Sequence, residues 1–164
     1  MSKSGAHHGR DRRMKAEIRV QDEPFDPWAE QARLQAGDSG AGALVAFVGT
    51  LRDFNEGDRV MAMTLEHYPG MTERILAAMA GEAAQRWSLR GVCMIHRVGQ
   101  LRPLEPIVLV AVTAVHRGDA FRACEFLIDF LKTRAPFWKK ETTEIGERWL
   151  EARTSDAAAQ DRWG

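Results

Sequence analysis

A proline placed soon after a run of helical periodicity is the feature that most restricts how this chain folds locally. Residues from about Asp119 to Arg134 repeat apolar side chains at helical spacing, and Pro136 follows. Proline lacks an amide hydrogen and disfavours helical geometry in the residue before it, so the predicted helix ends near Arg134. The inner stripe of this helix is predicted to be Phe121, Cys124, Leu127, Ile128 and Leu131.

Positive charge gathers around this helix end. Lys132, Lys139 and Lys140 lie close together in the sequence, beside the bulky apolar pair Phe137 and Trp138. Cations are favoured near a helix C-terminus, so a solvated basic end is one interpretation. The other is an anion site, in which Lys139, as a loop residue after the proline, folds back toward Lys132. A lysine held in this way can act as a base, an acid or a nucleophile, or can simply bind an anion.

The composition restricts where such a site can act. The chain has 164 residues, which suits one domain with its own core, and its 23 Lys plus Arg equal its 23 Asp plus Glu. This balance does not favour a nucleic-acid binder, so any anion site is local. Cys93 and Cys124 lie in apolar stretches and are expected to be buried thiols, with neither a disulfide nor a bound metal. No apolar run is long enough for a membrane helix or a signal peptide, and we expect a cytoplasmic protein.

The domain organisation is predicted to be simple. Residues 1–15 are polar, basic and poor in apolar side chains, which is typical of a flexible tail. Met14 is a candidate for the natural start, and a basic anchoring arm is the alternative. Residues 16–164 then form a single domain.

The predicted elements alternate between helices and adjacent pairs of strands. That order favours an α+β fold, with a mainly antiparallel sheet and helices packed against it. Asp26 caps the first helix, ahead of Pro27, and the inner side chains of the second begin at Met71. The predicted helices are 28–35, about 71–87 and 119–134. The predicted strands are 43–48, 60–67, 91–98, 107–115 and 148–153. Residues 51–58 are predicted to be a loop, residues 99–106 a hairpin turn, and Ser155-Asp156 the cap of a short terminal helix.

Further basic residues follow predicted strands, where rigid scaffolds often carry sites. Arg52 comes after the strand that ends near Gly49, and His116 and Arg117 come after the strand that ends at Val115. Their side chains can donate hydrogen bonds to a phosphate, although an arginine of this kind, taken alone, is more often part of a surface ion pair. His96, in contrast, lies inside an apolar predicted strand, and we interpret it as a structural residue whose ring has a hydrogen-bond partner.

Five motifs, taken together and in order, resemble the MoaE family, the large catalytic subunits of molybdopterin synthase. The resemblance runs from about Met14 to Trp163. Its motifs are Phe47–Arg52, Leu65–Thr72, Ile95–Gly99, His116-Arg117 and, most specifically, Leu131–Glu141.

The resemblance implies an α/β hammerhead fold and a sulfurtransferase activity. Members of the family form a homodimer within a heterotetramer, with a small ubiquitin-like MoaD-type subunit at each end. The partner's C-terminal thiocarboxylate supplies two sulfurs to cyclic pyranopterin monophosphate (precursor Z), giving molybdopterin. No metal and no resident cofactor are implied, because molybdenum arrives later.

The resemblance also implies residue roles. Lys139 is the first candidate for catalysis, stabilising developing charge or moving a proton, and Lys132 orients the thiocarboxylate or shares that role. Arg52, His116 and Arg117 are assigned to the substrate, chiefly to its phosphate, and one or both of the last two are candidates to come from the neighbouring subunit. The remaining predicted pocket residues are Thr50, Leu51, Lys140 and Glu141.

Two positions depart from the family pattern. The turn from Arg102 to Pro106 has Leu104 and lacks the glycine expected there, and Leu51 replaces a valine that is familiar in the family.

Two other functions compete with this interpretation. A non-catalytic anion-binding module would explain the basic cluster but gives no reason for a lysine beside Phe137. RNA binding would need a wider basic face.

Overall fold

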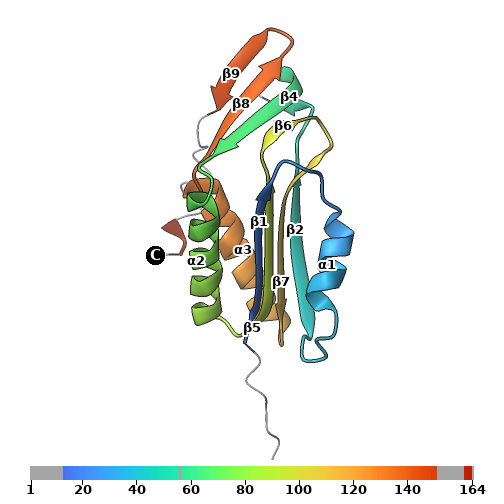
Figure 1. The fold of residues 1–164 in the computed structure, drawn as a ribbon, viewed down its shortest axis with the longest axis vertical. Helices are drawn as coiled ribbons and strands as arrows, with labels where there is room; N and C mark the ends of the chain where they lie inside the picture. Colours follow the sequence, from blue (N-terminus) through green and yellow to red (C-terminus); the bar gives the residue numbers. More distant parts are fainter. Residues whose placement is uncertain (1–12, 56, 151–160, 164) are drawn as a thin grey trace, which may run out of the picture.

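Two β-sheets and three helices make up the described part of the chain (Figure 1). The computed structural model describes residues 13–55, 57–150 and 161–163. This arrangement confirms the predicted α+β class. The elements in chain order are β1 Lys15–Gln21, α1 Pro27–Gln35, β2 Ala43–Thr50, β3 Phe54–Asn55, β4 Asp58–His67, α2 Met71–Arg86, β5 Leu89–Arg97, β6 Gly99–Leu101, β7 Pro106–Ala114, α3 Arg117–Thr133, β8 Phe137–Thr143 and β9 Gly146–Leu150.

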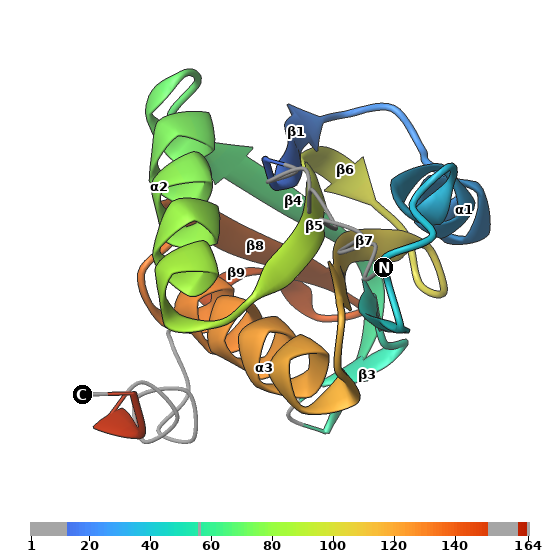
Figure 2. The ribbon, with the colours of Figure 1, turned by 90° about the horizontal axis from the view of Figure 1, so that it is seen from below.

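The body of the molecule is a four-stranded sheet in the order β1-β5-β7-β2. β1 pairs with β5 in parallel, whereas β5 with β7 and β2 with β7 are antiparallel. Helices α2 and α3 cover one face of this sheet and α1 covers the other (Figure 2). Side chains alternate along β5, so Val92 and Met94 pack toward α2 and α3 while Cys93 and Ile95 pack toward α1. His96 continues the α2 and α3 side at the upper end of β5.

A second sheet, here called the upper sheet, lies across one end of the body (Figure 1). Its strand order is β3-β4-β8-β9, and β6 also pairs with β4. β4 and β8 are antiparallel, with Leu65 opposite Lys139 and His67 opposite Phe137. A separate apolar cluster forms beneath this sheet, so its inner face is buried. The cluster consists of Leu51, Val60, Met63, Leu65 and Leu101.

The helix boundaries agree closely with the predicted ones. Helix α3 ends at Thr133, where Arg134 donates its backbone N–H to the Phe130 carbonyl at 2.9 Å. Asp26 caps α1, since its Oδ1 accepts hydrogen bonds from Trp28 N at 2.9 Å and from Ala29 N at 3.3 Å. The strands predicted at 43–48, 60–67, 91–98 and 107–115 are confirmed within a few residues.

Several local predictions were wrong or incomplete. Lys139 does not lie in a loop: it lies in strand β8, because pairing with β4 extends the chain directly after Pro136. Strand β1 was not predicted, and β3 and β6 occupy parts of the predicted loop and hairpin turn. The late strand begins at Gly146, and its described part ends at Leu150. The predicted tail up to residue 12 and the helix cap at Ser155-Asp156 lie outside the described residues.

Two apolar side chains do not face the core as expected. Phe121 is 62% exposed and Met71 is 50% exposed, although the other predicted inner residues of α2 and α3 pack against the body sheet. Cys93 and Cys124 are buried free thiols, as predicted. Among the described residues, no helix has the length and hydropathy needed to cross a membrane.

Candidate functional site

Lys132 and Lys139 lie on either side of the tight connection between α3 and β8. Lys132 is in the last turn of α3, and Lys139 is the third residue of β8. The backbone N–H of Phe137 donates to the Ala135 carbonyl at 2.9 Å across Pro136, so the chain turns sharply there. The proline therefore brings the helix end and the strand start to the same corner of the molecule, below the upper sheet.

Lys139 shares the inner face of the upper sheet. Directly opposed residues in an antiparallel pair point to the same side, and Lys139 lies opposite Leu65, which is only 1% exposed. Phe137, two residues earlier on β8, lies on that face as well, opposite His67. The Lys139 side chain is thereby directed toward the body of the molecule and is half-buried.

A buried histidine completes this corner. The His96 ring is stacked on Phe137, with ring centroids 4.0 Å apart and an interplanar angle of 22°. On the Phe137 ring, His67 makes a second, more distant contact at 6.3 Å. His96 Nδ1 lies 2.8 Å from the Arg97 carbonyl, which can only accept a hydrogen bond, so Nδ1 carries the hydrogen. We define the lysine site as Lys132, Lys139, Phe137, His67 and His96.

Burial and the charges of Lys139, Lys132 and His67 together lower the pKa of His96 to about 4, against the opposing effect of its hydrogen bond to the Arg97 carbonyl. Both lysines therefore act electrostatically on the same buried ring. The site combines two cations with a neutral aromatic wall. Such an arrangement suits an anionic ligand that also has an apolar or planar part.

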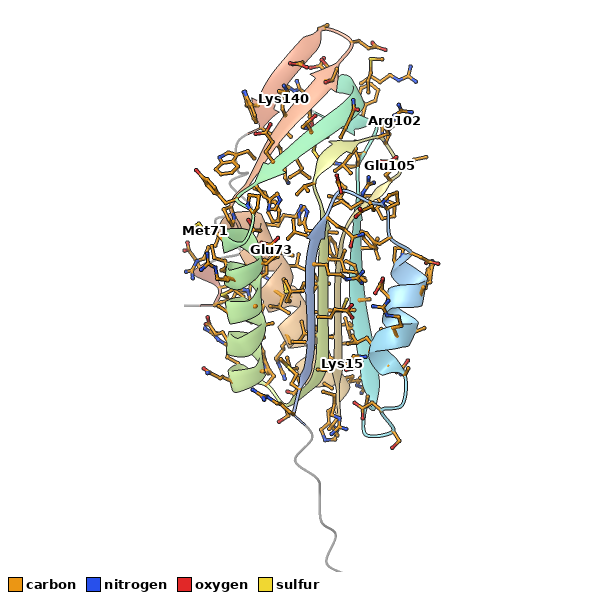
Figure 3. All side chains as sticks on the ribbon, viewed as in Figure 1. Lys15, Met71, Glu73, Arg102, Glu105 and Lys140 are labelled. Atoms are coloured by element: carbon orange, nitrogen blue, oxygen red, sulfur yellow. The ribbon has the colours of Figure 1, made fainter. Side chains whose placement is uncertain are left out.

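Lys140 and Glu141 have different surroundings from Lys139. Lys140 alternates to the outer face of the upper sheet, where its Nζ lies 3.3 Å from Glu147 and 5.7 Å from the centre of the Trp149 ring (Figure 3). Glu141 is buried and accepts hydrogen bonds from Asn55 Nδ2 at 2.7 Å and from Arg148 Nε at 3.1 Å. Glu141 thus ties β8 to β9 and to the β3 region.

Thr50, Leu51 and Arg52 lie at the other side of the upper sheet: Thr50 ends β2, and Leu51 and Arg52 follow it. Leu51 is buried, and its backbone is tied to the loop before β7: Leu104 N donates to Leu51 O at 2.9 Å, and Leu51 N donates to Glu105 O at 3.3 Å. Arg52 is exposed. The Asp53 carbonyl accepts from Val60 N, so Arg52 lies near the Val60 end of β4. Lys139 lies opposite Leu65, five residues along β4 from Val60, which is about 16 Å at about 3.3 Å per residue.

His116 and Arg117 lie at the opposite end of the body. They stand at the N-terminus of α3, while Lys132 stands near its C-terminus. A helix rises about 1.5 Å per residue, so Arg117 and Lys132 are about 22 Å apart along α3. One chain therefore brings Lys132 and Lys139 together but separates them from His116 and Arg117.

A group of potential metal ligands lies elsewhere, under α1. Ligand atoms of Glu17, Glu30 and Cys93 lie within 4.8 Å of one another. The carboxylates, however, are paired with arginines, with Arg19 at 2.5 Å from Glu30 and Arg33 at 2.7 Å from Glu17. Burial, reinforced by the two carboxylates, raises the pKa of Cys93 to about 11, so the thiol stays protonated. This group is an ion-pair network that holds α1 on the body sheet.

The sequence indicated a structural His96, and a His67 that either lines the site or shapes the turn, but it did not predict the stack of His96 on Phe137. The signal was present in the alternation of β5, since Val92, Met94 and His96 share one face and the last of them reaches the strand end. What the sequence did not show was that β8 returns over that end. That contact depends on the long-range pairing of β4 with β8.

Comparisons with known proteins agree with this architecture. The family described as "MoaE protein" matches residues 20–134. A molybdopterin synthase catalytic subunit from Ralstonia nicotianae is 56% identical over 147 residues, which cover 90% of this chain and 84% of that protein. A solved molybdopterin biosynthesis MoaE protein from Burkholderia ambifaria is 57% identical with a TM-score of 0.78, covering 91% of this chain and 98% of that one.

A more distant solved structure shows the same fold. The molybdopterin synthase structure from Staphylococcus aureus is 32% identical to this chain, with a TM-score of 0.74, and the match covers 82% of this chain and 96% of the other. The family match spans most of the chain and includes the end of α3 with Lys132. On these grounds, this chain belongs to the MoaE family.

Proposed function

We propose that this chain is the catalytic subunit of a molybdopterin synthase. It transfers two sulfurs from the C-terminal thiocarboxylate of a small MoaD-type partner to precursor Z, giving molybdopterin. The observation that carries the proposal is the convergence of Lys132 and Lys139 beside the neutral wall of Phe137 and His96. The proposed location is the cytoplasm, and the sulfur comes from the partner rather than from a resident cofactor.

The chemistry needs cations because both reactants are anions. A thiocarboxylate and a phosphate repel each other, and the two ammonium groups offset that repulsion and orient the sulfur. In each transfer the sulfur forms a bond to a substrate carbon while a carbon–oxygen bond at that carbon breaks, and the oxygen leaves with the opening phosphate or as water. Water then attacks the partner's acyl carbon, the acyl–sulfur bond breaks, the sulfur stays on the substrate, and the partner is left with an ordinary carboxylate. Lys139 is proposed to stabilise developing charge or to move a proton as the cyclic phosphate opens, and Lys132 is proposed to orient the thiocarboxylate.

A second copy of the chain is proposed to complete the site. His116 and Arg117 are too far from the lysines to share a ligand with them within one chain, as the length of α3 requires. The apolar side chains of Val115 and Phe121 are exposed beside them, which supports a protein contact at this end of α3. We propose a homodimer in which these residues approach the neighbour's lysine site, within a heterotetramer that carries two MoaD-type partners.

The decisive experiment measures molybdopterin formation from precursor Z and a thiocarboxylated partner. The unaltered chain is compared with Lys139→Ala, Lys132→Ala and the matched control Lys15→Ala, whose lysine lies at the far end of β1 and donates to the Arg33 carbonyl (Figure 3). We expect product from the unaltered chain and from Lys15→Ala, and loss of product in Lys139→Ala with partner binding retained. A folded, partner-bound chain that makes no product would contradict the proposal and favour a non-catalytic anion-binding module.

A further inference from the structure

His96 is a buried polar residue that the proposed sulfur transfer does not use. It is the penultimate residue of β5, beneath the upper sheet, and is 7% exposed. Its Nδ1–H is committed to the Arg97 carbonyl at 2.8 Å, which fixes the orientation of the ring and leaves Nε2 unprotonated in the neutral form. A ring fixed in this way is a rigid platform for whatever packs on it.

Phe137 packs on this platform and is held from a second side. The His96 and Phe137 centroids are 4.0 Å apart, and the His67 ring lies 6.3 Å from Phe137 at an interplanar angle of 31°. His67 Nδ1 is 3.4 Å from Thr72 Oγ1, and that hydroxyl donates to the Tyr68 carbonyl at 2.9 Å. The start of β8 is thereby fixed between β5 and the connection from β4 to α2.

The position of Phe137 determines the direction of Lys139. Residues two apart on a strand point to the same face, so both side chains face the body of the molecule. A slip of one residue in the pairing of β8 with β4 would turn Lys139 to the outer face, where Lys140 now lies. The stack on Phe137 opposes that slip.

The charge state of His96 suits this role. Burial and the charges of Lys139 on β8, Lys132 on α3 and His67 on β4 lower the pKa of His96 to about 4. The guanidinium of the adjacent Arg97 is directed elsewhere, donating to the Asp22 carbonyl at 2.9 Å and to Glu105 at 3.2 Å. At neutral pH, His96 therefore adds an aromatic surface to the lysine site without adding a third cation.

We propose that His96 is a positioning residue of the lysine site: its neutral ring, stacked on Phe137, sets the direction of Lys139, and it takes no part in proton transfer. The expected effect of His96 on catalysis rests on the proposed function. Its effect on the orientation of the Lys139 side chain does not depend on that function.

The kinetic test compares His96→Ala with the conservative variant His96→Phe in the synthase assay, after thermal unfolding and partner binding have shown that both fold. We expect His96→Ala to lower kcat by about tenfold or more with little change in KM, because Lys139 is misplaced. His96→Phe keeps a ring on Phe137, so we expect kcat within about threefold of the unaltered chain and the same pH profile. Equal losses in the two variants, or an altered pH profile in His96→Phe, would overturn the proposal by showing that an imidazole nitrogen is needed.

A second readout does not depend on catalysis. The chain has five lysines, so ¹³C-dimethylation gives a simple NMR spectrum in which a Lys139→Arg variant identifies the Lys139 signal. We expect this signal to move toward that of an exposed lysine in His96→Ala and to stay in place in His96→Phe. A Lys139 signal that stays in place in His96→Ala overturns the positioning role, whereas an inactive unaltered chain overturns only the proposed function.

Discussion

At the scale of single residues, Leu104 shows how a departure from a family pattern appears in the backbone. The sequence lacked the glycine expected between Arg102 and Pro106, and Leu104 has a φ of 71°, the only positive φ of a non-glycine residue in the described part of the chain. A side chain in this left-handed region costs roughly 1–2 kcal/mol. Leu104 is also 83% exposed, so no buried contact of its side chain offsets that cost.

We therefore predict that Leu104→Gly raises the thermal midpoint, by about 1–3 °C once the larger unfolded-state entropy of glycine is allowed for. The matched variant Leu104→Ala keeps the strained backbone and should bring no such gain. Calorimetry of the three proteins at equal concentration checks this. A midpoint for Leu104→Gly at or below that of Leu104→Ala would show that the strain is negligible.

The buried His96 makes stability depend on pH. Its pKa is about 4 in the folded chain and close to 6.5 in an unfolded chain, so below pH 6.5 the unfolded state binds more protons and stability falls. Between pH 7.5 and pH 5 this group alone should lower the free energy of unfolding by about 2 kcal/mol, an order-of-magnitude figure. In urea unfolding, His96→Phe should lack this part of the pH dependence. Identical pH dependence in both proteins would contradict the low pKa.

At the scale of elements, the sequence predicted what local chemistry controls and missed what distant pairing controls. The end of α3 followed from Pro136, and the start of α1 from Asp26 and Pro27. Strand β8 was missed, and Lys139 was predicted to be a loop residue, because residues 137–143 are mostly polar or charged and extend only through pairing with β4. The lysine pair could be predicted from its motif, whereas its wall of His96 and Phe137 depends on that same pairing.

The upper sheet should depend strongly on one charged network between β8 and β9. Arg148 donates to Glu141 at 3.0 Å and to Asp58 at 2.7 Å, and Glu141 is only 2% exposed. Arg148→Ala leaves a buried carboxylate without this cation, so we expect a loss of about 3 kcal/mol in unfolding free energy.

Hydrogen exchange of the β8 and β9 amides provides the local measurement for Arg148→Ala, and we expect faster exchange there. The matched control is Arg59→Ala, since Arg59 and Glu144 form an exposed pair at 3.8 Å that should contribute well under about 1 kcal/mol. Equal stability losses in the two variants would mean that the burial of Glu141 has no energetic weight.

At the scale of the whole molecule, the separation of the basic residues makes the proposed dimer testable. If each site combines Lys139 of one chain with Arg117 of the other, then Lys139→Ala and Arg117→Ala complement each other. A random equal mixture of the two variants should recover about a quarter of the normal activity, because half of the dimers hold one intact site of two. Activity of the mixture no higher than that of either variant alone would show that the site is built within one chain.

The surface of the proposed dimer is tested separately. Phe121→Glu places a charge in an exposed apolar position beside His116 and Arg117, and we expect it to shift the protein from dimer to monomer in sedimentation experiments. Trp28→Glu is the matched control, because Trp28 is 78% exposed but lies on α1, on the other face of the body sheet. A dimer that survives Phe121→Glu would place the contact elsewhere.

The pairing of β4 with β8 also sets the order in which the molecule can be assembled during synthesis. The four strands of the body sheet are all present once the chain reaches Ala114, but Leu65 must wait for Lys139 before the upper sheet can close. Until then no strand covers His96, and a solvated histidine titrates near 6.5. The lysine site is therefore completed late, and a ribosome-bound chain that ends at α3 has the body sheet and Lys132 but still lacks Lys139 and the ring of Phe137.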